Sequence, residues 1–283
     1  MRTVFSSSTD VIHLFAQRTQ DHARSSNVFF DSDKIYSYGY HYLLGEFITN
    51  KNGDFAIIIN NSGYSSTTSG HISCLSAATR QYKQFFTMYC DSNKVLRQLE
   101  SLLQNLGNAK KPQKYISEAL NILDHFNEFL SWFGKPYDSF SQENLKKIRR
   151  IEKLFNSSPG KESAEQYAKK KAAAQKASDK KDFLKSLQKF KNFEINYINH
   201  NSYNKEDFLR VNTKSGNIET SQGVKVPIKE AQTLYKLIKA GKDIKGLKIS
   251  NYTVISLNGV LQIGCHRINR KTMQEIGEQI INE

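Results

Sequence analysis

Short runs of alternating apolar and polar residues, separated by turn signals, make up the first 90 residues of the chain. Period-two alternation predicts strands, and Asn-Gly or Asp-rich stretches between such runs predict hairpins. A short helix is expected to end near Arg18, and a second helix is expected near Gly70 to Tyr82. The predicted strands are Val28–Phe30, Lys34–Tyr38, Leu43–Thr49, Asp54–Asn60 and Phe85–Cys90.

The middle of the chain repeats apolar residues every three or four positions, which is the spacing of one face of a helix. Leucine and isoleucine stripes predict helices over Asn93–Leu106, Pro112–Phe133 and Ser141–Phe155. A fourth helix is expected over Glu162–Phe193. Its first twenty residues are rich in Ala and Lys and have no apolar stripe. This part should therefore be exposed, whereas Phe183 and its apolar neighbours should dock the end of the helix.

The last 80 residues return to short strands. Pro227 suits the first turn of a helix that ends before Gly241, and Asn258-Gly259 is a strong hairpin signal. The predicted elements here are strands at Phe208–Val211, Asn217–Thr220, Val224–Val226, Lys248–Leu257 and Val260–Ile263, and a final helix at Ile268–Ile281.

Together these patterns predict an α+β fold in three consecutive segments. A small α+β unit is expected at 1–91, a basic helical segment at 92–200 and a second small α+β unit at 201–283. Seventeen Phe and 14 Tyr argue against a disordered chain. The sequence contains neither an apolar leader nor an apolar run of membrane-spanning length. An intracellular protein that does not bind membranes is therefore expected.

The cysteines and histidines show no spacing that is typical of a metal site. Cys74, Cys90 and Cys265 are far apart and are expected to be reduced thiols. No Cys-x-x-Cys, His-x-His or His-Glu-x-x-His pattern occurs, so no metal and no other cofactor is predicted. The alternative is an imidazole–carboxylate site drawn from His13, His22, His41, His71, Asp21, Asp31 and Asp33.

Cys265 and His266 are adjacent, and a nucleophilic cysteine needs a base such as histidine within hydrogen-bond distance. Successive residues of a strand point to opposite faces, so His266 is not expected to serve Cys265 in this role. A buried Cys265 with a capping histidine is the expectation.

Four short motifs in the outer parts of the chain form a recognisable set. The first part carries Ile35–Gly39 followed by His41, and then Gly63–His71, which is rich in Ser and Thr. The last part carries Thr220–Gly223 and Ile263–Ile268. The set resembles a family of uncharacterised proteins of tailed bacteriophages and other mobile elements, over about the outer 90 and 75 residues. The resemblance implies a phage accessory role in the cytoplasm of a bacterial host, and it implies no particular activity.

His41 and His71 are the candidate catalytic residues. Each lies beside hydroxyl-rich sequence, and two such imidazoles could form a general acid/base pair that acts on a phosphodiester. The alternative is structural, with Ser65 to Ser69 capping a helix and the two histidines making ordinary hydrogen bonds.

The net charge of +14 is concentrated in the centre of the chain. Residues 145–191 contain fifteen Lys or Arg and only five Asp or Glu, whereas the flanking segments are close to neutral. Concentrated positive charge predicts contact with a polyanion, and lysines neutralise phosphates without reading bases. The candidate nucleic-acid-binding residues are Lys146, Lys147, Arg149, Arg150, Lys153, Lys169, Lys170, Lys171, Lys176, Lys180 and Lys181.

These observations favour a phage-type intracellular accessory protein that is not an enzyme and that binds DNA, RNA or a nucleic-acid-bearing assembly. The two α+β units are expected to act as docking or homo-oligomerisation modules. Three alternatives stay open at this point: an inhibitor of a host defence nuclease or CRISPR effector, a virion component, and a histidine-dependent phosphodiesterase.

Overall fold

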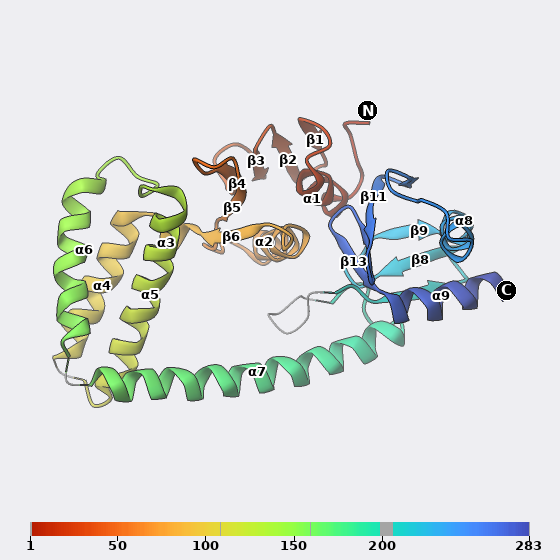
Figure 1. The fold of residues 1–283 in the computed structure, drawn as a ribbon. Coiled ribbons are helices and arrows are strands. Elements are labelled where there is room, and N and C mark those ends of the chain that lie inside the picture. The colour runs from red at the N-terminus through yellow and green to blue at the C-terminus, as the bar shows by residue number, and fades with distance from the viewer. Residues whose placement is uncertain (1, 108, 159, 199–205, 283) are drawn as a thin grey trace. The chain divides into compact units, whose positions relative to one another are not determined.

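The computed structural model describes residues 2–107, 109–158, 160–198 and 206–282. The fold is mixed α+β, as predicted, with helices in the middle of the chain and sheets toward both ends (Figure 1). Among these residues, no helix is both long enough and apolar enough to cross a membrane. The boundary expected between residues 200 and 201 lies outside the described residues.

The chain forms two compact units, and neither is continuous in sequence. The first unit is made of Met1–Leu44, Gly63–Gln81 and Asp179–Glu283, and the second is made of Gly45–Ser62 and Tyr82–Ser178. This division cuts across the three segments expected from composition, at 1–91, 92–200 and 201–283. The segments follow changes in residue type, whereas the units follow packing, and the segment between Leu44 and Gly63 packs with the middle helices.

The N-terminal part of the first unit packs two helices with a short antiparallel ribbon. Its elements are α1 (Ser8–Gln17), β1 (His22–Arg24), β2 (Val28–Asp31), β3 (Lys34–Ser37) and α2 (Ser66–Ala78). The side chains of Ser7 and Ser65 accept hydrogen bonds from the first turns of α1 and α2. Helix α1 contacts both α2 and β2, and its residues from Val11 to Ala16 are buried.

The C-terminal part of the first unit holds two antiparallel sheets and two helices. Its elements are β7 (Leu209–Asn212), β8 (Asn217–Thr220), β9 (Lys225–Pro227), α8 (Ile228–Lys239), β10 (Lys248–Ile249), β11 (Tyr252–Leu257), β12 (Val260–Ile263), β13 (His266–Asn269) and α9 (Arg270–Asn282). Leu234, Val254, Leu261 and Ile268 form the centre of its core. The core therefore joins a helix to three strands.

The second unit is a helical bundle preceded by three strands. Its elements are β4 (Leu43–Thr49), most of which belongs here, β5 (Phe55–Ile59), β6 (Lys83–Phe86), α3 (Thr87–Cys90), α4 (Ser92–Leu106), α5 (Pro112–Phe133) and α6 (Ser141–Asn156). Strand β5 is antiparallel to β4 and parallel to β6. The predicted apolar stripes meet in the bundle, where Leu99, Phe126 and Ile148 are buried together.

Helix α7 (Lys161–Lys191) contributes residues to both units. Its Ala164 packs into the helical core of the second unit, and its Phe183 and Phe190 pack into a small core of the first unit. Between these anchors the helix has no apolar stripe, as the sequence predicted.

Three local predictions were wrong. The strand expected over Phe85–Cys90 is β6 followed by the helical turn α3. The strand expected over Lys248–Leu257 is broken into β10 and β11 at Ser250, whose φ of 51° reverses the chain. The first residues of the expected helix at Ile268 belong instead to β13, which pairs with β12 residue for residue. That missed strand carries His266.

Candidate functional site

The predicted nucleic-acid-binding residues all lie on the surface, on helices α6 and α7. Each of the five on α6 is exposed, because the residues that face the bundle core are Ile148, Ile151 and Phe155. Part of this charge is neutralised within the helix, where Lys147 pairs with Glu143 and Arg149 pairs with Glu152. The net positive charge of α6 is consequently smaller than its five basic residues alone would give.

The six predicted lysines of α7 are exposed, and so are the alanines between them. Lys169, Lys176 and Lys180 are seven and four residues apart, which places their side chains along one face of the helix. Lys170 and Lys171 extend the charge around the helix. All predicted lysines except Lys180 and Lys181 belong to the second unit.

The end of α7 is held by a buried arginine. Arg210 on β7 donates hydrogen bonds from Nη1 to the carbonyl oxygens of Phe190 and Ile195, at 2.5 and 2.8 Å. Its guanidinium carbon also lies 4.3 Å from the ring centroid of Phe190, within range of a cation–π contact. Glu219 accepts a hydrogen bond from Arg210 Nε at 2.7 Å, so the buried guanidinium is neutralised. The helix is thereby fixed at one end while its lysine-rich middle contacts solvent.

His41 and His71, the candidate catalytic residues, differ in their surroundings. His71 Nδ1 lies 2.9 Å from Ser37 Oγ, and burial lowers the pKa of His71 below its usual 6.5. His41 is exposed and follows the turn at Gly39, and no hydrogen bond among the described residues joins it to His71. Ser65 caps α2, as the structural alternative expected. The phosphodiesterase hypothesis based on these two residues stays a prediction.

A different set of side chains converges in the first unit, from three separate elements. His13 lies on α1, Cys265 lies in the turn between β12 and β13, and His266 begins β13. All three are buried, and their donor atoms lie within 4.8 Å of one another. The shortest distance is 2.8 Å, between His13 Nδ1 and Cys265 Sγ. The two imidazoles are stacked, with ring centroids 4.8 Å apart.

Asp207 fixes the orientation of His266. Its Oδ2 accepts hydrogen bonds from His266 Nδ1 at 3.0 Å and from the Arg267 backbone at 3.2 Å. Its Oδ1 accepts from Arg80 at 2.5 Å and from Gln222 at 2.6 Å. Burial alone would raise the pKa of Asp207, but these donors lower it overall, so the group is a carboxylate. A carboxylate can only accept, which places the His266 proton on Nδ1 and leaves a lone pair on Nε2 when the ring is neutral.

The thiol and the imidazoles change each other's acidity. Burial raises the pKa of Cys265, yet the nearby His13 and His266 lower it overall to about 6. Burial lowers the pKa of His13, yet the thiols of Cys265 and Cys74 raise it well above its usual value. Thiolate beside imidazole is the pairing of cysteine nucleophiles, and thiolate with imidazole is also a ligand set for transition metals.

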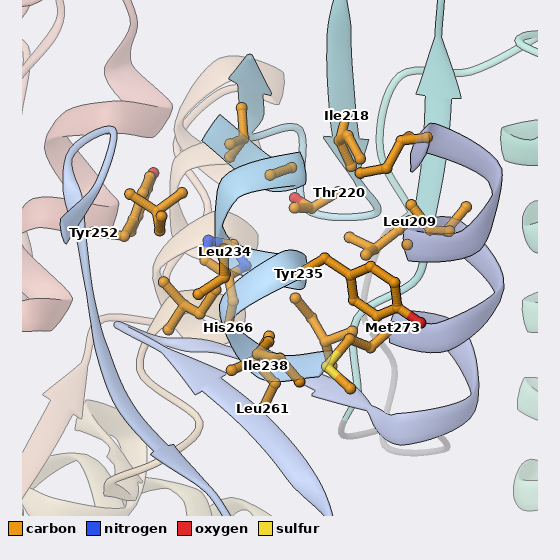
Figure 2. Close-up of a pocket in the computed structure, with 18 of the residues that line it drawn as sticks. Leu209, Ile218, Thr220, Leu234, Tyr235, Ile238, Tyr252, Leu261, His266 and Met273 are labelled. Carbon is orange, nitrogen blue, oxygen red and sulfur yellow. The ribbon is translucent and has the colours of Figure 1, made fainter. Parts of the chain in front are cut away.

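The surroundings of the cluster restrict what can reach it. His266 and Tyr252 line an apolar pocket of about 80 Å³ within the C-terminal core (Figure 2). Cys74 and Gln222, which interact with His13 and Asp207, line a second and more polar pocket of about 540 Å³. Cys265 lines neither pocket and is fully buried. The sulfur is therefore shielded from any substrate of ordinary size, whereas a bare ion needs little space.

The turn before β13 explains why sequence reasoning missed this cluster. Gly264 has a φ of 54°, a left-handed conformation that suits glycine, and its Cα faces the side chain of Gln17 on α1. This turn replaces the extended backbone expected at Cys265, so Cys265 and His266 are not held on opposite faces. His13 is 252 positions away from Cys265. No spacing motif can reveal a contact between residues so far apart. The sequence did show that Cys265 and His266 directly follow Gly264, a residue that favours turns.

Comparisons of the chain with models of protein families, with curated proteins and with solved structures found no match. Function is therefore inferred from the residues and the geometry of this chain.

Proposed function

We propose that this chain binds DNA or RNA, or an assembly that carries nucleic acid, through the exposed lysines of α7 and the basic residues of α6. One observation carries the proposal. Between Lys169 and Lys181 the helix exposes six lysines and has no apolar stripe. A helix built this way gains nothing from packing in its middle, so its surface is available to a polyanion.

The type of contact follows from the residue types. Lysine is a flexible point charge that neutralises phosphate and releases condensed counterions, and it carries little information about sequence. Tyr167 is the one aromatic side chain of α7 that is exposed, at 39%. Base stacking along α7 therefore makes little contribution, and binding should tolerate any sequence.

The cellular role is a further part of the proposal. On the motif resemblance, we place this binding in a phage-type accessory protein that acts without catalysis in a bacterial cytoplasm.

The test is equilibrium binding of the full chain to fluorescently labelled duplex DNA, single-stranded DNA and RNA of unrelated sequences at low salt. We expect binding to at least one of these classes, with similar affinity for different sequences of that class. Replacing Lys169, Lys170 and Lys171 by Gln should weaken binding about tenfold or more, since three phosphate contacts are lost. Glutamine keeps the helix propensity of lysine, so α7 should remain intact.

A matched control separates local charge from net charge. Lys242, Lys245 and Lys248 are also exposed, and replacing all three by Gln removes the same charge outside α6 and α7. This control should bind nearly as well as the unmodified chain. Absence of binding to every probe, or equal losses in the two triple variants, would refute the proposal.

A further inference from the structure

Two buried imidazole nitrogens lack hydrogen-bond partners beside a buried thiol. The Nε2 atoms of His13 and His266 have no hydrogen-bond partner among the described residues, and both rings are almost completely buried. A polar atom that leaves water without a replacement partner destabilises the folded state. A ligand bound to such a nitrogen would remove that penalty.

We propose that His13, Cys265 and His266 bind a Zn²⁺ ion. Thiolate and neutral imidazole are the usual zinc donors, with Zn–S distances of about 2.3 Å and Zn–N distances of about 2.0 Å. Two atoms bound tetrahedrally to one such ion are about 3.3–3.8 Å apart. The three donor atoms lie within 4.8 Å of one another, so side-chain rotations bring them to this separation. Zinc needs a thiolate and neutral imidazoles, so binding releases to solvent the proton that the thiol and imidazoles share, and it involves no redox step.

Asp207 does not bind the ion in this site but accepts a hydrogen bond from His266, one of its ligands. Histidines that bind metals usually donate their second N–H to a carboxylate or carbonyl, which fixes the ring and raises its basicity. The bond from His266 Nδ1 to Asp207 is of this kind and directs the Nε2 lone pair away from the carboxylate. Arg80 and Gln222 hold Asp207 in turn. Hydrogen bonds thus hold both the donor His266 and the carboxylate that orients it.

A second thiol interacts with one of the three donor residues. Cys74 on α2 interacts with the imidazole of His13, is half-buried and lines the polar pocket. Zinc prefers four ligands in structural sites, and Cys74 is the candidate for the fourth. The site would then use two of the three cysteines of the chain.

The experiment uses the full chain, purified under reducing conditions, stripped with a chelator and then titrated with Zn²⁺. We expect one zinc per chain to remain bound through gel filtration, measured by mass spectrometry of the metal. Co²⁺ in place of Zn²⁺ should give the absorption bands of a tetrahedral cobalt–thiolate complex, which report the sulfur ligand directly.

Cys265→Ala should abolish the stoichiometric zinc and the cobalt–thiolate absorption. Cys90→Ala is the matched control, because Cys90 is equally buried but packs among apolar residues of the second unit. This control should bind zinc as the unmodified chain does. Circular dichroism checks that each variant folds, and Cys265→Ser serves if the alanine variant does not.

Either of two results overturns the proposal: an unmodified chain that binds no zinc, or a folded Cys265 variant that binds zinc as tightly as Cys90→Ala does. Both results are independent of nucleic-acid binding.

Discussion

Two carboxylates in the first unit, Asp207 and Glu219, are buried beside arginines. Asp207 pairs with Arg80 and His266, and Glu219 pairs with Arg210. A buried ion pair contributes little net stability compared with apolar packing, but removal of one partner leaves an uncompensated charge. Replacing either carboxylate by its amide removes a buried charge, but only the change at Asp207 is expected to affect zinc binding.

Asp207→Asn should weaken zinc binding about 10- to 100-fold, because the amide no longer holds the His266 ring as a carboxylate does. Competition with a chromophoric chelator measures this affinity. Glu219→Gln is the control, since it also neutralises a buried carboxylate beside an arginine, and it should leave zinc affinity unchanged. Equal affinities for the two variants would show that Asp207 does not position the site.

Glu219→Gln should also change how stability depends on pH. Burial alone would raise the pKa of Glu219, but the hydrogen bonds from Arg210 and Asn212 lower it below its usual 4.5. A lowered pKa stabilises the folded chain above the unfolded value, and this stabilisation is lost as the pH falls through the folded value. Urea unfolding should therefore show the variant to be less stable by about 3 kcal/mol at neutral pH.

The difference in the free energy of unfolding between the two chains should shrink below a pH of about 4. A difference that stays constant from neutral to acidic pH would mean that the carboxylate charge is not what stabilises Arg210.

Among the helices, replacing glycine by alanine is expected to have opposite effects on stability at two positions. A methyl group at Gly277 on α9 would lie 2.5 Å from the ring of Tyr235 on α8, whereas at Gly70 on α2 it would meet nothing within 4 Å. Gly277→Ala should destabilise the chain by about 1–3 kcal/mol through overpacking. Gly70→Ala should stabilise it by about 0.5–1 kcal/mol, since alanine favours a helix. Thermal unfolding measures both, and a shift of the same sign in the two variants would contradict the α8–α9 packing.

Most elements could be predicted from the sequence because their signals are local. The apolar stripes of α4, α5 and α6 and the turns around Gly53 and Gly259 depend on neighbours a few positions away. Strand β13 was missed because its pairing with β12 follows a turn at Gly264, which lies against Gln17 of α1. The His13–Cys265–His266 cluster was missed for the same reason, since its members come from distant parts of the chain.

In the molecule as a whole, most of the predicted basic residues and the buried thiol–imidazole cluster belong to different units. Most of the predicted basic residues lie on helices of the second unit, whereas the thiol–imidazole cluster lies in the first. The proposed nucleic-acid surface could be located from composition, because charge runs need no knowledge of packing. The structure adds that α7 is anchored by Ala164 at one end and by Phe183 and Phe190 at the other.

The most direct test of the nucleic-acid surface is the salt dependence of the dissociation constant for a labelled DNA duplex. Each phosphate contact contributes about 0.9 to the slope of the logarithm of affinity against the logarithm of salt concentration. The unmodified chain should show a steep slope. The variant with Gln at positions 169, 170 and 171 should show a slope smaller by about 2–3, whereas the variant with Gln at 242, 245 and 248 should keep the original slope. A flat salt dependence, or identical slopes for all three chains, would contradict binding through α7.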